Sequence, residues 1–322
     1  MNARTLVVLS LALLPLAAPR PAAAQDYPAK TINIVVPLSA GGGTDVLARV
    51  VAGKLHEKFG QPVTVENKPG AGGNIGADLV AKAPPDGYTL MFTQPGPLVV
   101  NKALYAKLNY DPDQFVPIAL VSHQDILLAV SPKLPVNSLQ ELIAYAKANP
   151  GRLNYGSSGA GSAPHLAAEL FGSMAGVKMV HVPYKGSSGY TTAILGGQID
   201  LAFFAFSSAL RNAKAGKLRA LGVGGKKRNA LMPEVPSISE VIPGYSATSY
   251  TALVATPGTP APVAHKLAQA VAEIVKLPEI QTRLHDAGDE SFDMTPEQVA
   301  TFLAEERQRW SKLIKAVGVT AL

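Results

Sequence analysis

The chain has 322 residues, with 29 Lys and Arg, 23 Asp and Glu, and a formal net charge of +6. Hydrophobic residues make up 47% and charged residues 16%, which excludes an intrinsically disordered protein, and the length favours two domains over one. Cysteine is absent, which excludes a disulfide framework, a thiolate metal site and a cysteine nucleophile.

The first 24 residues predict a secretory signal peptide. Arg4 precedes an apolar run over residues 6–18, and an A-x-A cleavage site ends at Ala24. The run is shorter than the about 20 residues that a membrane-spanning helix needs. Cleavage after Ala24 removes two arginines and no acid, so it lowers the net charge from +6 to +4. We therefore expect an exported protein that resides in the periplasm.

Short β-rich runs alternate with helical patterns along the rest of the chain. Strands are predicted over residues 32–36, 62–65, 88–92, 117–122, 126–130, 153–155, 179–182, 199–204, 218–223 and 250–255. The main helices are predicted over residues 44–59, 74–82, 138–148, 163–174, 190–195, 261–275, 278–286 and 296–316. This alternation predicts an α/β fold of mostly parallel sheets flanked by helices.

Two successive sets of strands and helices predict two lobes joined by more than one crossing. The runs over 126–130 and 250–255 are the natural crossing strands, and the polar turn His123–Asp125 is expected to separate strand 126–130 from the one before it. Lobe 1 would comprise residues 26–127 and 248–322, and lobe 2 residues 128–247.

The first of three glycine-rich turns, Leu38–Asp45, lies between a predicted strand and a helix. Successive glycines let backbone N–H groups point into a cavity, and the helix dipole favours an anion there. No Gly-Lys-Ser/Thr follows, so the turn is not a Walker loop. The candidate ligand-binding residues are Leu38, Ser39, Gly41, Gly42, Gly43 and Asp45. For Asp45 the alternative is that its carboxylate offsets the helix dipole.

The second turn, Gly70–Gly76, has the spacing G-x-G-x-x-x-G rather than that of a dinucleotide fingerprint. The strand that follows ends at Thr93 and Gln94 and offers no acid for a ribose. We therefore predict a helix start at the rim of the cleft, and we retain Gln94 as a candidate ligand-binding residue.

The third turn, Tyr155–Ser162, offers hydroxyl and small-residue donors suited to a carboxylate. Its candidate ligand-binding residues are Ser157, Ser158, Gly161 and Ser162. Ala160 breaks the G-x-S-x-G pattern of a hydrolase nucleophile, and His165 is expected to cap or orient the turn. Lys185 could supply the cationic end of an anion site, or it could be a solvated lysine.

The remaining residues give little support for catalysis, a metal or a nucleic acid. The histidines have no metal-ligand spacing, no acid pair suits acid–base work, and no cofactor motif is present. The basic run over 226–228 is predicted to be a solvated loop, and the 20 aromatic residues are too scattered for a nucleic-acid surface. The mild positive charge could instead steer small anions into a cleft.

Several segments resemble the Bug-type solute-binding proteins of tripartite tricarboxylate transporters. The segments are PLSAGGGTDVLAR, GQPVTVENKPGAGGNIGADLVAKAPPDGYTL, LYAKLNYDPDQFVPIALV, YGSSGAGSAPHLAAELF, HVPYKGSSGYTTAILGGQIDLAF, AGKLRALGV, VPSISEVIPGY, ATPGTPAPVAHKLAQAV and EERQRWSKLIKAVGV. They cover essentially the whole mature chain in order.

The resemblance implies a two-lobed type II periplasmic-binding-protein fold, a Venus flytrap, that closes on a small carboxylate. It implies delivery of that ligand to integral membrane permease subunits. We expect a monomer, and the residues predict no cofactor, no metal site and no catalysis. The ligand turns would be Leu38–Asp45 and Ser157–Ser162, with water and backbone groups mediating carboxylate contacts.

The chain departs from the family pattern after the YKG motif, where Gly189 and Ala193 stand in place of the usual Pro and Asp. The identity of the ligand therefore cannot be carried over from the family. Two other functions stay open: a ligand sensor for a membrane signalling partner, and an exported α/β enzyme. No nucleophile–base pair or nucleotide fingerprint at the proper spacing supports the enzyme.

Overall fold

The computed structural model describes residues 27–184 and 186–318. The strands are β1 (Ile32–Val36), β2 (Val63–Asn67), β3 (Thr89–Thr93), β4 (Val116–Val130), β5 (Asn154–Ser157), β6 (Val180–Pro183), β7 (Leu201–Ala205), β8 (Arg219–Val223), β9 (Thr248–Ala255) and β10 (Asp289–Glu290). The α-helices are α1 (Gly43–Phe59), α2 (Asn74–Ala81), α3 (Asn101–Leu104), α4 (Leu139–Ala148), α5 (Ala163–Ala175), α6 (Ser187–Gly196), α7 (Phe206–Lys214), α8 (Ala261–Val275), α9 (Pro278–Ala287) and α10 (Pro296–Val317). The predicted signal peptide and Lys185 lie outside the described residues.

The strands pair in the order β2-β1-β3-β9-β4-β7-β5-β6, with β8 and β10 both added to β4. Parallel pairing joins β1 to β2 and β3, and it joins β5 to β6 and β7. The long strands β4 and β9 run antiparallel to each other and to their other neighbours. The α/β class is confirmed, and the sheet is mixed because these two strands run in opposite directions.

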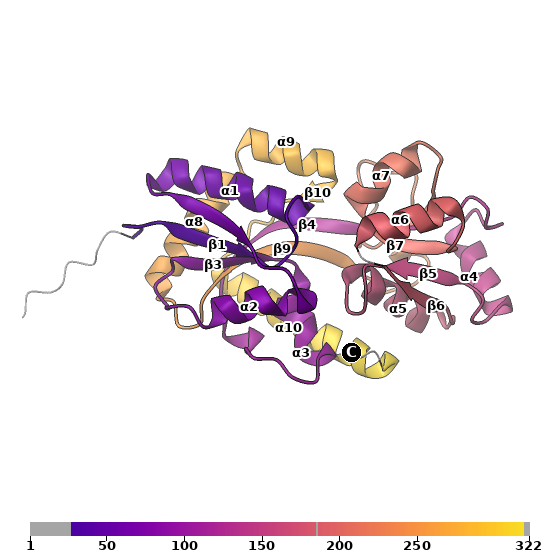
Figure 1. The fold of residues 1–322 in the computed structure, drawn as a ribbon. Helices are drawn as coiled ribbons and strands as arrows, with labels where there is room; N and C mark the ends of the chain where they lie inside the picture. Colours follow the sequence, from indigo (N-terminus) through magenta and orange to yellow (C-terminus); the bar gives the residue numbers. More distant parts are fainter. Residues whose placement is uncertain (1–26, 185, 319–322) are drawn as a thin grey trace, which may run out of the picture.

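Figure 1 shows two groups of elements, with β4 and β9 running between them. We call β1–β3 with α1–α3 and α8–α10 the first half, and β5–β8 with α4–α7 the second half. In the first half, α1 and α8 pack on one face of the sheet, and α2 and α10 on the other. In the second half, α4 and α5 cover one face, and α6 and α7 cover the other. Helices therefore flank both faces, as predicted.

The predicted break at His123–Asp125 is wrong, because β4 is one strand of 15 residues that pairs with β9 through this stretch. The polar side chains that suggested a turn have partners within the fold. Gln124 Nε2 donates to Asp289 Oδ1 at 2.8 Å, and Asp125 Oδ2 accepts a hydrogen bond from Asn229 at 3.0 Å. A strand can keep polar residues in its interior when neighbouring segments satisfy them.

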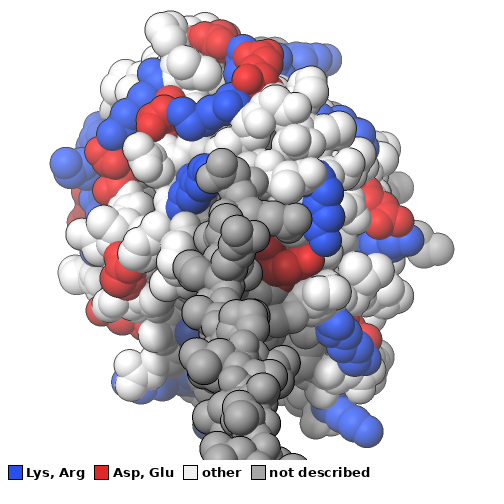
Figure 2. All heavy atoms as spheres, turned by 90° about the vertical axis from the view of Figure 1, so that its left-hand side faces the viewer, with Lys and Arg blue, Asp and Glu red and all other residues white. Residues whose placement is uncertain are grey.

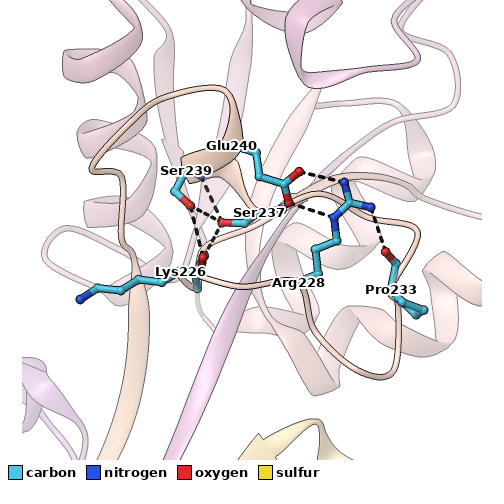
Figure 3. Close-up of polar contacts among 7 residues, drawn as sticks. Lys226, Arg228, Pro233, Ser237, Ser239 and Glu240 are labelled. Carbon is cyan, nitrogen blue, oxygen red and sulfur yellow. Dashed lines mark hydrogen bonds and ion pairs between the residues drawn. The ribbon is translucent and has the colours of Figure 1, made fainter.

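The basic run over 226–228 is exposed, as predicted for a solvated loop. Its last residue is nevertheless held, since the Arg228 guanidinium donates to both carboxylate oxygens of Glu240, at 2.9 and 2.8 Å (Figure 3). On the face seen in Figure 2, Lys and Arg side chains alternate with Asp and Glu rather than forming one basic stripe. No helix within the described part of the chain is long and apolar enough to cross a membrane.

Candidate functional site

A cavity of about 880 Å³ lies between the two halves, where the chain leaves the ends of β1, β3 and β5. This volume is within the range of about 300–1,000 Å³ that is typical of small-molecule sites. The first residues of α1, α5, α6 and α7, or the residues just before them, also line it. Several helix N-termini therefore face one space, and their unpaired N–H groups favour an anionic ligand.

The first turn supplies one wall of the cavity. Its predicted residues that line the cavity are Leu38, Ser39, Gly41, Gly42 and Gly43. Gly41 has a φ of +82°, a left-handed conformation that favours glycine over any residue with a side chain. Gln94, from the end of β3, also lines the cavity, and its Nε2 donates to Thr44 Oγ1 at 3.0 Å. The turn therefore presents mainly backbone and small polar groups to the cavity.

Asp45 was predicted to bind ligand, but the structure places it behind the first turn rather than on the cavity wall. Its side chain is 3% exposed, and its Oδ2 accepts a hydrogen bond from the Gly41 N–H at 2.9 Å. Arg49 and Asn67 reach its other oxygen, both at 3.0 Å. The hydrogen bond from Arg49, followed by that from Gly41, lowers the pKa of Asp45. The carboxylate therefore anchors the turn, while Arg49 offsets its repulsion of an anion.

The third turn supplies the opposite wall through Ser158, Gly161 and Ser162. Ser157, predicted to bind ligand, is fully buried instead, where its Oγ accepts a hydrogen bond from the Gly159 N–H at 3.0 Å. Its hydroxyl is turned inward because strand residues alternate between faces and Ser157 still belongs to β5. The Ser162 hydroxyl donates to the Gly159 carbonyl at 2.7 Å and steadies the turn.

His165 orients the third turn, as predicted. Its Nδ1 accepts a hydrogen bond from the Gly161 N–H at 3.0 Å, and the ring is buried. Gly161 itself has a φ of +75°. The nearest atom of the other half is Leu104 Cδ2, which would lie 2.0 Å from a Cβ added to Gly161. Glycine is therefore required here both by the backbone conformation and by this close approach.

The crossing strands form a polar floor that sequence reasoning missed. Ser122 and Gln124 of β4 lie directly opposite Thr251 and Ser249 of β9, and all four line the cavity. Ser122 and Gln124 are two residues apart on β4, and Ser249 and Thr251 are two residues apart on β9. The two residues on each strand therefore share one face of it. In β9 the apolar Tyr250 lies between Ser249 and Thr251, and this alternation was the available signal. In β4 residues 122–125 are all polar, so the stretch was assigned to a turn instead.

Two charged residues line the cavity among the residues that the structure describes, and sequence reasoning identified neither. Arg283 is exposed on α9, and Asp289 follows in β10. Burial raises the pKa of Asp289 to about 6; the hydrogen bond from Gln124 opposes this shift, and the charge of Asp125 adds to it. The cavity therefore has its charged groups on a single segment, α9–β10, while both turns carry neutral donors.

The two departures from the family pattern lie in α6, and neither lines the cavity, although Ser187 and Tyr190 of the same helix do. Ala193 is buried in the core of the second half, and a Cβ on Gly189 would lie 3.1 Å from Tyr184 Cβ. Within residues 27–184 and 186–318, no cluster of three or more His, Asp or Glu could hold a metal ion.

The chain matches one family of known proteins along most of its length. The family model described as tripartite tricarboxylate transporter family receptor matches residues 47–319. Protein BugT of Bordetella pertussis is 34% identical over 318 residues, which cover 98% of each chain. The likeness therefore extends over nearly the whole length of both proteins.

Three solved structures share the fold. The structure titled R. palustris Rpa4515 with adipate has a TM-score of 0.83 and 35% identity, covering 92% of this chain and 100% of that one. Periplasmic binding protein BugD has a TM-score of 0.79 and 32% identity, covering 91% and 99%. MatC from Rhodopseudomonas palustris with bound malate has a TM-score of 0.79 and 32% identity, covering 89% and 100%. The chain belongs to the tripartite tricarboxylate transporter receptor family, whose Bug-type solute-binding proteins share this two-lobed α/β fold.

Proposed function

We propose that the protein is a periplasmic solute-binding protein that captures a small carboxylate in the cavity and delivers it to a tripartite tricarboxylate transporter permease. The observation that carries this proposal is the convergence of glycine-rich turns from both halves on a single cavity. The lobes would be residues 26–127 with 248–322, and residues 128–247, with export directed by the first 24 residues. The solved structures of one relative with adipate and of another with bound malate support a carboxylate ligand.

The proposed contacts come from both walls of the cavity. Backbone N–H groups of Gly42 and Gly43, at the start of the 17-residue helix α1, would meet one side of the carboxylate. Ser158 and the N–H groups at the start of α5 would meet the other. Water can complete such contacts, because a bridging water is nearly as favourable as a direct hydrogen bond. Closure of the lobes would follow from tighter binding of the carboxylate to the closed state.

Binding without catalysis fits the residues at the site. Ser158 is the exposed hydroxyl of the third turn, and no histidine is among the described residues that line the cavity. A serine nucleophile needs a base within hydrogen-bond reach, so the geometry gives no support to an exported hydrolase. A sensor role would use the same binding site and would differ only in the partner that contacts the loaded protein.

A thermal-shift screen of mono-, di- and tricarboxylates and amino acids tests the ligand class. A ligand at 100 times its Kd should add about 2.7 kcal/mol to the free energy of unfolding. If no carboxylate shifted the transition while nucleotides or sugars did, the proposal would be wrong. Loss of carboxylate uptake in a strain that lacks the protein, with restoration by the full chain, tests delivery to a permease.

Gly42→Leu tests the first turn as part of the site. Gly42 has a φ of −76°, and the nearest atom to an added Cβ is Ser39 O at 3.7 Å. A side chain is therefore tolerated by the backbone but projects toward the cavity, so carboxylate binding should be lost while the fold is kept. Gly53→Leu is the matched control, since Gly53 is an exposed position of the same helix with open space around it. Equal affinity in the two variants would remove the first turn from the site.

A further inference from the structure

Two histidines lie behind the third turn and do not line the cavity. The rings of His165 and His181 stack with their centroids 4.2 Å apart and their planes at 22°. Tyr155 stacks on His181 at 5.0 Å and donates its hydroxyl hydrogen to Glu169. A stacked imidazole pair beneath a turn that faces the cavity is not needed for any ligand contact proposed above, so its role has to be sought in the turn itself.

Each ring holds a different end of the turn. At its carboxyl end, the Gly161 N–H donates to His165 Nδ1 at 3.0 Å. At its amino end, Ser157 Oγ lies 2.6 Å from His181 Nε2 and also accepts the Gly159 N–H. The two imidazoles thus fix both ends of the segment whose middle residues line the cavity.

We propose that His165, with His181 stacked on it, is a positioning residue that keeps the third turn in its ligand-binding conformation only while its ring is neutral, so that carboxylate affinity falls in acid. The proposal rests on the carboxylate-binding function above. Only a neutral ring with its proton on Nε2 leaves His165 Nδ1 free to accept. In the imidazolium form both nitrogens carry hydrogen, so the Gly161 N–H would face another N–H.

Protonation of both rings would also place two positive charges 4.2 Å apart in a buried site. The titratable side chains that face the two imidazole rings are those of Tyr155 from β5 and Glu169 from α5. Glu169 Oε1 is 3.9 Å from His165 Nε2, too far for a hydrogen bond, and already accepts one from Tyr155. Glu169 therefore offers an imidazolium only partial compensation.

The balance of these effects favours the neutral rings. Burial lowers the pKa of His165 to about 4. Burial, and then the charge of His165, lowers the pKa of His181 to about 4, while Glu169 acts in the opposite direction. The third turn should accordingly be held at neutral pH and released as the pH falls below about 5.

The test compares wild type with His165→Asn and His165→Leu by isothermal titration calorimetry with adipate between pH 7.5 and 4. The Asn side-chain oxygen can accept the Gly161 N–H but does not titrate, whereas Leu offers no acceptor. At pH 7.5 we expect His165→Asn to bind within about threefold of wild type and His165→Leu at least about tenfold more weakly. His265→Asn, an exposed histidine on α8, is the matched control and should follow wild type at every pH.

The decisive quantity is the ratio of the wild-type affinity to the His165→Asn affinity at each pH. Protonation of adipate itself changes both affinities equally and therefore cancels in this ratio. We expect wild type to lose about a further tenfold relative to His165→Asn between pH 7.5 and pH 4. A purely structural histidine would give a constant ratio, and a constant ratio would overturn the inference while leaving carboxylate binding intact.

A measurement on the ligand-free protein separates this inference from the proposed function. Nitrogen-15 NMR should show the His165 ring as the neutral Nε2–H tautomer from pH 7.5 to about 5. The Gly161 amide resonance should then shift with the same midpoint as the ring. A His165 ring that titrates near pH 6.5 without moving the Gly161 amide would also overturn the inference, whatever the ligand.

Discussion

The contact between Gly161 and Leu104 gives a quantitative test of how the two halves meet at the cavity. Gly161 lies in the third turn of the second half, and Leu104 ends α3 in the first half. A Cβ at position 161 would lie 2.0 Å from Leu104 Cδ2, far inside van der Waals contact, on a backbone with a φ of +75°. Gly161→Ala therefore introduces a backbone strain and a steric overlap at once.

The two costs can be separated. A left-handed residue with a Cβ costs about 1–2 kcal/mol, and relief of an overpacked contact costs about 1–3 kcal/mol. We expect Gly161→Ala to lower the free energy of unfolding by about 2–5 kcal/mol. Gly159→Ala is the control for strain alone, because Gly159 has a φ of +114° and no heavy atom would lie within 4 Å of its Cβ.

Urea denaturation of the single variants, Leu104→Ala and the double variant measures the steric share. Truncation of Leu104 removes the atom that an alanine at 161 would strike, so the double variant should be about 1–3 kcal/mol more stable than the sum of the singles predicts. Carboxylate affinity should fall in Gly161→Ala and recover in part in the double variant. Strict additivity of the two substitutions would refute the contact, and with it this arrangement of the halves.

Three further predictions concern charged residues. Asp45→Ala should lower the free energy of unfolding by about 1–3 kcal/mol in urea denaturation, because the Gly41 N–H loses its buried acceptor; unchanged stability would contradict an anchoring role. Asp289→Asn should stabilise the protein at pH 7.5 but not at pH 4, by at most about 3 kcal/mol, since a pKa raised to about 6 costs stability as the pH rises through it. A pH-independent effect in thermal denaturation would oppose that assignment. Arg283→Gln should weaken adipate binding by roughly two- to fivefold and hexanoate binding less, as measured by calorimetry; equal losses would show that Arg283 does not meet a second carboxylate.

Local sequence patterns were sufficient to predict the alternating strands and helices. They failed where contacts with a segment distant in sequence determine the secondary structure. Strand 32–36 was predicted with the bounds of β1, since a short apolar run followed by a helical pattern needs no distant information. The interior of β4 reads as a turn because Gln124 and Asp125 are polar. Their partners, Asp289 and Asn229, lie 165 and 104 residues further along the chain. No local window contains them, so this break could not be distinguished from a real one.

The same limit explains which parts of the candidate site were predicted. Glycine-rich segments between a strand and a helix are visible in sequence, and residues of all three predicted turns line the cavity, with Gly70, Gly72 and Gly73 from the second. Arg283 and Asp289 belong to a helix and a two-residue strand that only the tertiary fold brings to that cavity. An exposed arginine on an amphipathic helix has no local feature that separates it from other surface arginines.

Asp45 and Ser157 show what a turn built from backbone donors requires of its side chains. Because other N–H groups of each turn face the cavity, a polar side chain in the turn can lie behind it. Asp45 and Ser157 do so, and they accept hydrogen bonds from the N–H groups of Gly41 and Gly159. Backbone donors are the same for any small carboxylate, so such turns can provide affinity but little discrimination. Selectivity among carboxylates is therefore expected from the polar floor of β4 and β9 and from Arg283 and Asp289, the parts of the cavity where side chains differ in charge and reach.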